Sequence, residues 1–286
     1  MQIRIAPSLG ELEGHPNDIW GTSEYQGASL EPAVFFGLYG FKDFIALWSH
    51  KGPKFILWAG SDIRHFTNGY WLDAVGEIRL DPHALGSWID QFCYSYVENE
   101  VEKEALEKVG IYSTLTVVPS FLGKPEDFPV SFKAAVGDVG MNVGNTNVRL
   151  YTSVSGNDFE LYGWDKIPSL ARQNRDVEFH LYGNTVEPPF QLAYRTNIIL
   201  HGRVPKEQMN EEIKGMTGAL RLTEFDGFSE ILAKSVLMGQ WPVSLIPYPH
   251  MLQPDEIKTL KCKLEPNLEG RDYYLARLNK YPWNTK

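Results

Sequence analysis

Short apolar segments alternate with longer segments of helical periodicity in the first part of the chain. Strands are predicted at Gln2–Ala6, Ala33–Gly37, Phe55–Trp58, Phe92–Val97 and Leu115–Val118. Helices are predicted at Lys42–His50 and Glu98–Val109. Because strands and helices alternate in this way, the pattern predicts a parallel sheet with covering helices.

The alternation restarts after a Gly- and Asn-rich stretch at residues 123–147, which is typical of an exposed linker or loop. Strands are predicted at Val148–Val154, Val177–Tyr182, Ile198–Leu200, Ala219–Leu222 and Pro242–Leu245. Helices are predicted at Ile167–Gln173, Lys206–Met216 and Ser229–Met238. The expected fold class is therefore α/β, with two Rossmann-like lobes and an inter-lobe cleft at the carboxyl ends of their strands. The alternative is one larger α/β domain with a long insertion.

These patterns divide the chain into four parts. Residues 1–122 form the first lobe, 123–147 the linker or loop, and 148–265 the second lobe. Residues 266–286 contain an amphipathic aromatic segment, Asp272–Trp283, which is predicted to be helical. This C-terminal helix either returns to the first lobe or simply packs where it lies.

The composition of the chain limits which classes of partner are expected. The chain has 286 residues and a formal net charge of −9, so nucleic acid and anionic lipid are not expected partners. Its two cysteines, Cys93 and Cys262, make neither a disulfide framework nor a zinc-binding spacing. No signal peptide precedes the first strand, and no run of about 20 apolar residues predicts a transmembrane helix. A cytoplasmic location is expected.

The segment Arg221–Lys234 carries the most chemistry. A strand is followed by a polar turn and then by a helix that begins near Ser229, a candidate N-cap. Free amides at a helix start bind phosphate, and Gly227 permits a close backbone approach. Asp226, directly before them, is placed to hold a sugar hydroxyl. The residues alone favour, by a small margin, an ordinary strand–turn–helix corner.

Several segments, in order, resemble the retaining GT-B glycosyltransferases, especially glycosyltransferase family 4. Thr223–Gly239 resembles the donor-site signature, in which an acidic residue precedes Gly-Phe; Asp226 takes that position. The other similar segments are Phe55–Asp62, Val117–Ser120, Leu150–Gly163, Val177–Gly183 and His201–Pro205. The resemblance covers roughly residues 30–250, with the first lobe on the acceptor side and the second binding the donor.

The resemblance implies a retaining hexosyltransferase that uses a nucleotide-sugar, UDP- or GDP-linked, as co-substrate and needs no cofactor. The acceptor is a glycan, a lipid-linked molecule or a small molecule. No Asp-x-Asp motif is present, and no metal site is expected. The implied catalytic residues are Asp226 and Asp62. The implied donor-binding residues are Ser155, Gly156, Asn157, Tyr162, Asn184, Arg203, Val204, Gly227, Phe228, Ser229, Glu230 and Lys234.

Three departures from the family pattern open alternatives. Lys234 stands where the family has a second carboxylate, Asn157 and Tyr162 stand where it has an Arg and a Lys, and Ala59 replaces a His. A leaving diphosphate still needs compensating positive charge, and we expect Lys234 to supply part of it. The alternatives are a noncatalytic GT-B-like nucleotide- or sugar-binding protein, and a phage-type DNA-base glycosyltransferase.

Overall fold

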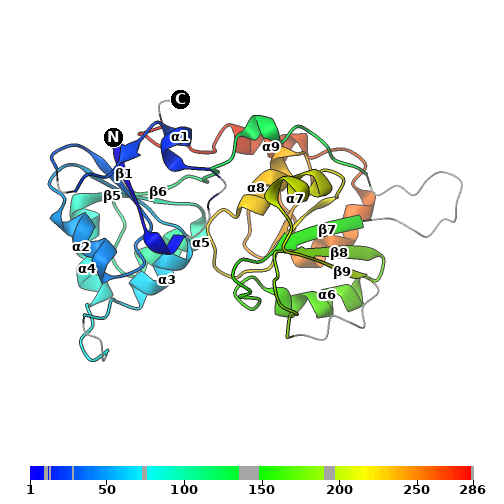
Figure 1. Ribbon diagram of the computed structural model, residues 1–286, viewed down its shortest axis with the longest axis horizontal. Coiled ribbons are helices and arrows are strands. Elements are labelled where there is room, and N and C mark those ends of the chain that lie inside the picture. Colours follow the sequence, from blue (N-terminus) through cyan, green and yellow to red (C-terminus); the bar gives the residue numbers. More distant parts are fainter. Residues whose placement is uncertain are drawn as a thin grey trace, which may run out of the picture. The chain divides into compact units, whose positions relative to one another are not determined.

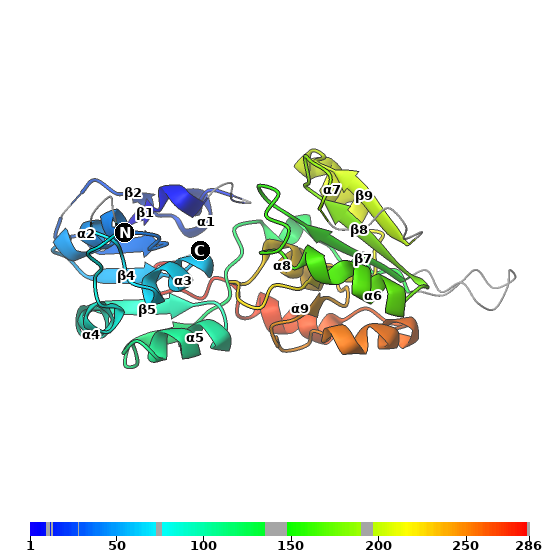
Figure 2. The same ribbon diagram turned by 90° about the horizontal axis from the view of Figure 1, so that it is seen from below.

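The computed structural model describes residues 1–9, 12, 14–27, 29–72, 76–134, 148–189 and 197–284. The chain divides into two compact units. The first unit comprises Met1–Lys124, Phe225–Phe228 and Arg277–Lys286; the second comprises Pro125–Glu224 and Ser229–Ala276. Each contains one parallel sheet with helices (Figures 1 and 2). Of the predicted linker, residues 125–134 belong to the second unit and residues 135–147 lie outside the described residues.

The first unit is built on a six-stranded sheet in the order β2-β1-β3-β4-β5-β6, and every pair in it is parallel. The strands are β1 (Gln2–Ile5), β2 (Ser23–Glu24), β3 (Ala33–Phe36), β4 (Lys54–Leu57), β5 (Cys93–Val97) and β6 (Leu115–Val117). The helices are α1 (Pro16–Trp20), α2 (Phe41–Ser49), α3 (Ser61–Thr67), α4 (Pro82–Phe92) and α5 (Glu100–Glu107), and a 3₁₀ turn covers Pro7–Leu9.

Strand β3 shows why its sequence is apolar throughout. All of its residues are buried, because both faces of a parallel sheet are covered. Ala33 and Phe35 join the core on one face, and Val34 and Phe36 join the core on the other. A continuous apolar run is therefore the expected pattern for this strand.

The second unit is built on a five-stranded parallel sheet in the order β11-β10-β7-β8-β9. The strands are β7 (Val148–Ser153), β8 (Val177–Tyr182), β9 (Ile198–Gly202), β10 (Gly218–Arg221) and β11 (Val243–Ser244). The helices are α6 (Ile167–Gln173), α7 (Lys206–Ile213), α8 (Glu230–Leu237) and α9 (Leu268–Leu275), with 3₁₀ turns at Pro125–Asp127, Trp164–Lys166 and Pro254–Cys262. No helix among the described residues is both long and apolar enough to cross a membrane.

The order of the strands in this sheet reverses at β7. The chain runs outward from β7 through β8 to β9, and then returns to place β10 and β11 on the other side of β7. The carboxyl ends of β7 and β10 therefore flank a topological switch point, which is where open α/β sheets bind ligands. The fold itself thus singles out the loops after β7 and β10.

The C-terminal segment differs from the helix predicted over Asp272–Trp283. Helix α9 is shorter and begins earlier, and Asn279 beyond it has the left-handed backbone, with φ of 55°. Its side-chain amide donates to Phe121 O at 2.6 Å and accepts from Phe121 N at 3.0 Å, which fixes the bend. Beyond the bend, Tyr281 and Trp283 are buried in the core of the first unit.

Candidate functional site

The loops after β7 and β8 are tied together at the carboxyl edge of the second sheet. Asn157, with φ of 59°, donates from Nδ2 to Thr185 Oγ1 at 2.7 Å and accepts from Thr185 N at 2.8 Å. Ser155 and Gly156 precede it and are exposed, and Gly156 has a left-handed backbone with no neighbouring heavy atom within 4 Å of an added Cβ. This loop therefore presents an open backbone turn next to the switch point.

The other predicted donor contacts of this edge follow β8 and β9. The two strand ends are joined by the hydrogen bond from Gly183 N to Gly202 O, at 2.8 Å. Asn184 donates from Nδ2 to Val186 O at 3.1 Å, while the exposed Arg203 and the partly buried Val204 follow β9. The structure thus gathers Ser155, Gly156, Asn157, Asn184, Arg203 and Val204 along one sheet edge.

Two cations that the sequence analysis did not select lie at the switch point. The guanidinium of Arg221, the last residue of β10, lies 4.3 Å from the ring centroid of Tyr162 in the loop after β7, and Arg221 is only 8% exposed. Lys166 Nζ donates to Leu222 O at 3.3 Å and lies 3.2 Å from Glu224 Oε1. Tyr162 occupies a position at which the family pattern has a basic residue, and the structure places the charge of Arg221 on its ring.

Lys234 lies inside the second unit, and its predicted contact with the donor stays a prediction. It is 5% exposed, its ammonium donates to Asn210 Oδ1 on α7 at 3.1 Å, and it lies 5.6 Å from the ring centroid of Phe128. Helix α8 begins at Glu230, with Ser229 as the N-cap residue, but the Ser229 hydroxyl makes no capping hydrogen bond. The predicted N-cap position is therefore confirmed without a hydroxyl cap, and the Lys234 ammonium is engaged inside the second unit.

The predicted Asp226–Phe228 corner belongs to the first unit, where it is closely packed. Asp226 O accepts a hydrogen bond from Asn99 Nδ2 at 2.7 Å. Phe228 N donates to the carboxylate of Glu98 at 2.5 Å, so this amide is already paired with an anion supplied by the chain. The expected open row of amides is therefore corrected at Phe228.

Glu98 and Glu102 form a buried acidic pair beside this corner. Glu102 Oε2 accepts from Glu98 N at 2.7 Å, and both residues lie at the junction of β5 and α5. Burial raises the pKa of both carboxyl groups well above the usual Glu range, and neighbouring acids raise it further. Neither residue was selected from the sequence, because both lie in Glu98–Val109, which is typical of an ordinary charged helix.

Asp62, predicted to act on the substrate, is fully buried at the start of α3. Its Oδ2 accepts from Leu38 N at 2.8 Å and its Oδ1 accepts from Ala59 N at 3.0 Å. Burial raises its pKa to about 6, although these amides act in the opposite direction. In this structure the carboxylate connects the loops after β3 and β4 to the start of α3, and its predicted catalytic role stays a prediction.

A histidine pair in the second unit was also missed. His180 Nδ1 lies 2.9 Å from His201 Nε2, and the His201 ring stacks on Tyr182 with centroids 4.1 Å apart. Tyr182 donates from its hydroxyl to Glu212 Oε2 at 2.7 Å, and His201 Nδ1 lies 3.5 Å from the same oxygen. Burial lowers the pKa of both imidazoles, and the neighbouring His201 lowers that of His180 further.

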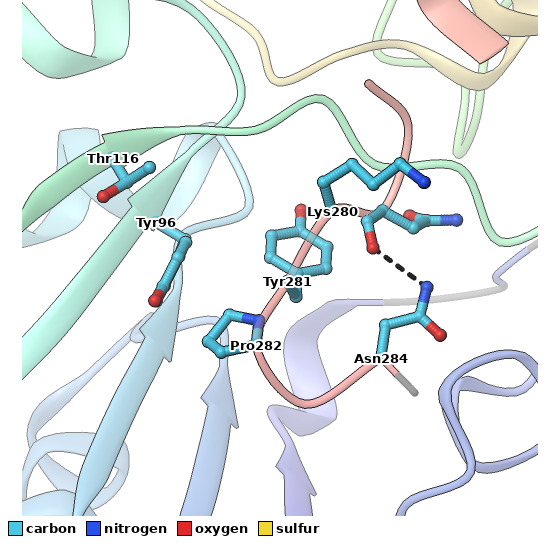
Figure 3. Close-up of a pocket in the computed structure, with 7 residues that line it drawn as sticks. Tyr96, Thr116, Lys280, Tyr281, Pro282 and Asn284 are labelled. Atoms are coloured by element: carbon cyan, nitrogen blue, oxygen red, sulfur yellow. Dashed lines mark hydrogen bonds between the residues drawn. The ribbon is translucent and has the colours of Figure 1, made fainter. Parts of the chain in front are cut away.

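A pocket of about 410 Å³ lies in the first unit beside the C-terminal segment (Figure 3). Tyr96 and Thr116 of the sheet and residues of the segment from Asn279 onward line it, and Asn284 donates to Asn279 O at 2.9 Å. Because its sheet residues come from within β5 and β6 and not from their carboxyl ends, it is not part of a switch point.

The comparisons with known proteins bear on the fold. No family model matches the sequence, and no curated protein matches it. The chain is similar to sucrose-phosphate synthase from Thermosynechococcus elongatus, with a TM-score of 0.57, 11% identity, and coverage of 86% of this chain and 69% of that one. It is similar to HepE from Anabaena in complex with UDP and glucose, with a TM-score of 0.56, 11% identity, and coverage of 88% and 75%.

A third structural relative is TarM, with a TM-score of 0.52, 10% identity, and coverage of 88% of this chain and 52% of that one. This chain thus spans about half the length of TarM. These structures are GT-B glycosyltransferases, so the predicted fold class, two Rossmann-like α/β lobes of the GT-B type, is confirmed. At these identities the likeness concerns the fold.

Proposed function

We propose that the chain transfers a hexose from a UDP- or GDP-linked donor to an acceptor hydroxyl, with retention of the anomeric configuration. The observation that carries this proposal is the switch point of the second sheet, where the Arg221 guanidinium lies over Tyr162 of the loop after β7 and Lys166 contacts the loop after β10. The GT-B fold supports it, since structural relatives of this fold are glycosyltransferases and one was solved with UDP and glucose. The predicted cytoplasmic location belongs to the same proposal.

The chemistry follows from the departure of a nucleoside diphosphate. Negative charge develops on the leaving phosphate, and fixed cations near it lower the barrier. Arg221, Lys166 and Arg203 supply that charge in the proposal, and the turn at Ser155–Asn157 receives phosphate oxygens. Asn184 and Val204 lie along the nucleoside. Lys234 is left out, because its ammonium is engaged by Asn210.

The sugar end of the donor is assigned to Asp226, whose carboxylate orients a hydroxyl of the hexose. Retaining transfer passes through an oxocarbenium-like state, for which the protein supplies positioning and electrostatic stabilisation. The acceptor is a glycan, a lipid-linked molecule or a small molecule that carries the attacking hydroxyl. No cofactor is part of the proposal.

A noncatalytic nucleotide- or sugar-binding protein is the second candidate. Two observations favour it: the Phe228 amide is paired with Glu98, and the Asp62 carboxylate is paired with two backbone amides. Both pairings engage groups that the family resemblance assigns to the site, Phe228 to donor binding and Asp62 to catalysis. This candidate predicts nucleotide binding without turnover of an activated sugar.

The experiment is a thermal-shift titration with UDP, GDP and ADP, followed by NMR of the products formed from the matching nucleotide-sugars. We expect stabilisation by UDP or GDP and release of sugar as the donor's own anomer. Arg221→Met should weaken nucleotide affinity about tenfold or more, because it removes a charge-assisted contact. Arg172→Met is the matched control, since Arg172 is exposed at the end of α6, directly before β8 begins.

Three outcomes separate the candidates. Binding with turnover supports the transferase, and binding of a nucleoside diphosphate without turnover of any activated sugar supports the noncatalytic protein. If no nucleoside diphosphate raises the melting temperature, and Arg221→Met and Arg172→Met behave alike, the assignment of the switch point is refuted.

A further inference from the structure

The backbone of the segment Phe225–Phe228 is held at consecutive residues. Asn99 Nδ2 donates to Asp226 O, and Phe228 N donates to Glu98 Oε2. Between these contacts Gly227 lies against Gly60, so closely that a Cβ on Gly60 would be 2.5 Å from Gly227 N. Three contacts on neighbouring residues fix the direction of this backbone, and therefore the direction in which the Asp226 side chain leaves it.

Glu98 and Glu102 differ in how their oxygens are used. The Glu98 carboxylate accepts backbone N–H groups from Phe228 and Ser120, which favours its ionised form. Glu102 Oε2 accepts from Glu98 N, whereas its buried Oε1 has no hydrogen-bond partner among the described residues. A fully buried carboxylate oxygen without a partner is costly, and protonation of that oxygen relieves the cost.

In the described part of the chain, the charged groups that act most strongly on the pair are acids. The titratable groups that face Glu98 and Glu102 are two acids, Asp62 and Asp226, and the Tyr281 phenol. Two adjacent buried carboxyl groups do not both ionise at neutral pH, and they titrate as a coupled pair. The pattern of accepted hydrogen bonds places the negative charge on Glu98 and the proton on Glu102.

We propose that Glu98 is a positioning residue that aims the Asp226 carboxylate through the Phe228 amide, and that it does so only while Glu102 carries a proton. The proposal rests on the proposed function in one respect, the role of Asp226 toward the donor sugar. Loss of the Glu102 proton to solvent leaves two like charges in a buried space and releases the segment.

The direction of the pH effect follows because the Glu102 carboxyl group binds its proton more tightly when the segment Phe225–Phe228 is held than when it is released. The segment is held while the pair keeps one proton, and it is progressively released as the pH rises through the raised pKa of the pair. An anionic ligand is not needed for this change. The proposal therefore makes a prediction about the free protein.

Hydrogen exchange of the Phe228 amide, measured by NMR between pH 5 and 9 and normalised to the intrinsic rate, tests the proposal. In the unmodified protein, protection should fall as the pH rises. Glu98→Ala should lower protection about tenfold to a hundredfold at low pH, because it removes a charge-assisted acceptor. Glu102→Gln mimics the protonated side chain and should keep the protection while removing its pH dependence.

Glu100→Gln is the matched control, because Glu100 is an exposed residue of the same helix start, with a side chain 71% exposed. It should change neither the protection nor its pH dependence. A Phe228 amide that stays protected in Glu98→Ala, or a pH dependence that persists in Glu102→Gln, overturns the proposal. If Glu98→Ala does not fold, Glu102→Gln still decides.

Kinetics separate this proposal from the proposed function. With an active donor, Glu98→Ala should lower kcat about tenfold or more, and Glu98→Gln, which keeps an acceptor oxygen, should restore most of it. The affinity for the nucleoside diphosphate should stay within about twofold, because the phosphate contacts are assigned to Arg221 and Lys166. Absence of turnover in every protein refutes the transferase, while the exchange result still judges the carboxyl pair.

Discussion

The substitution Gly227→Ala tests how closely the Asp226–Phe228 corner is packed. A methyl group on Gly227 would overlap Glu98 Oε2 and would lie 3.7 Å from Glu102 Oε1. Gly227 is not among the glycines with a left-handed backbone, so alanine adds no backbone strain there. The whole effect of the substitution therefore arises from the contact with the Glu98 carboxylate.

Two contributions set the expected magnitude. Displacing the carboxylate breaks the hydrogen bond from Phe228 N to Glu98, and a hydrogen bond to a charged group contributes about 1.5–3 kcal/mol. Forcing a methyl group into a closely packed site costs a further ~1–3 kcal/mol. At roughly 2–4 °C for each kcal/mol in a unit of this size, the melting temperature should fall by about 5–24 °C.

Scanning calorimetry at pH 6 and at low salt gives the measurement. Gly215→Ala is the control, because its added Cβ would meet its nearest neighbours at 3.7 Å or more, which is ordinary contact. If Gly227→Ala melts within about 2 °C of Gly215→Ala, the corner is not packed against Glu98, and the positioning role of Glu98 is refuted with it.

Three further predictions concern other parts of the chain. Burial lowers the pKa of His180 and His201, so the stability that their neutral forms contribute to the second unit is present above pH 6.5 and is lost as the pH falls. Between pH 7.5 and 5.5, the melting temperature of His201→Phe, which keeps the stacking on Tyr182, should fall less than that of the unmodified protein. Lys234→Met should leave nucleotide affinity within about twofold by calorimetric titration, because the Lys234 ammonium is engaged inside the second unit; a larger loss would restore Lys234 as a donor contact. Trp283→Ala should destabilise the first unit by about 3–5 kcal/mol in urea unfolding, because Trp283 is 3% exposed and its ring stacks on Tyr281. A loss below about 1 kcal/mol would show that the C-terminal segment is not docked.

The local pattern of apolar and polar residues was sufficient to predict the bounds of an element wherever burial follows a simple period. Strand β8 and helix α6 have the predicted bounds, Val177–Tyr182 and Ile167–Gln173. The segment Asp272–Trp283 shows the limit, because its amphipathic pattern continues past the true end of α9. The bend there depends on the pairing of Asn279 with Phe121, which are far apart in the sequence, and no local period reports such a contact.

The same distinction explains the candidate site. Loop residues such as Asn157 and Asn184 were selected through the family resemblance, and both follow strands whose ends reach the sheet edge. Arg221 was not, because its importance depends on the ring of Tyr162, and the sequence does not show that the two meet. A basic residue at the end of a strand carries no signal of function in the sequence, because the signal depends on which residue it contacts across the switch point.

The Phe228 amide shows where inference from the sequence succeeds and where it ends. Sequence reasoning identified an amide beside an acidic residue as an anion-binding group, and in the structure that amide does bind an anion, the carboxylate of Glu98. The chemical inference about the backbone was sound, whereas the identity of the anion depends on Glu98, which follows β5 and is far from Phe228 in the sequence. A buried carboxylate that accepts from an amide also fixes the orientation of that amide. Glu98 therefore prevents the Phe228 amide from binding a ligand, and the same contact can orient the neighbouring Asp226 side chain toward a ligand. The turnover of Glu98→Gln therefore decides between a transferase and a binding protein. Recovery of kcat relative to Glu98→Ala supports positioning by Glu98, and nucleotide binding without turnover in every variant supports a binding protein.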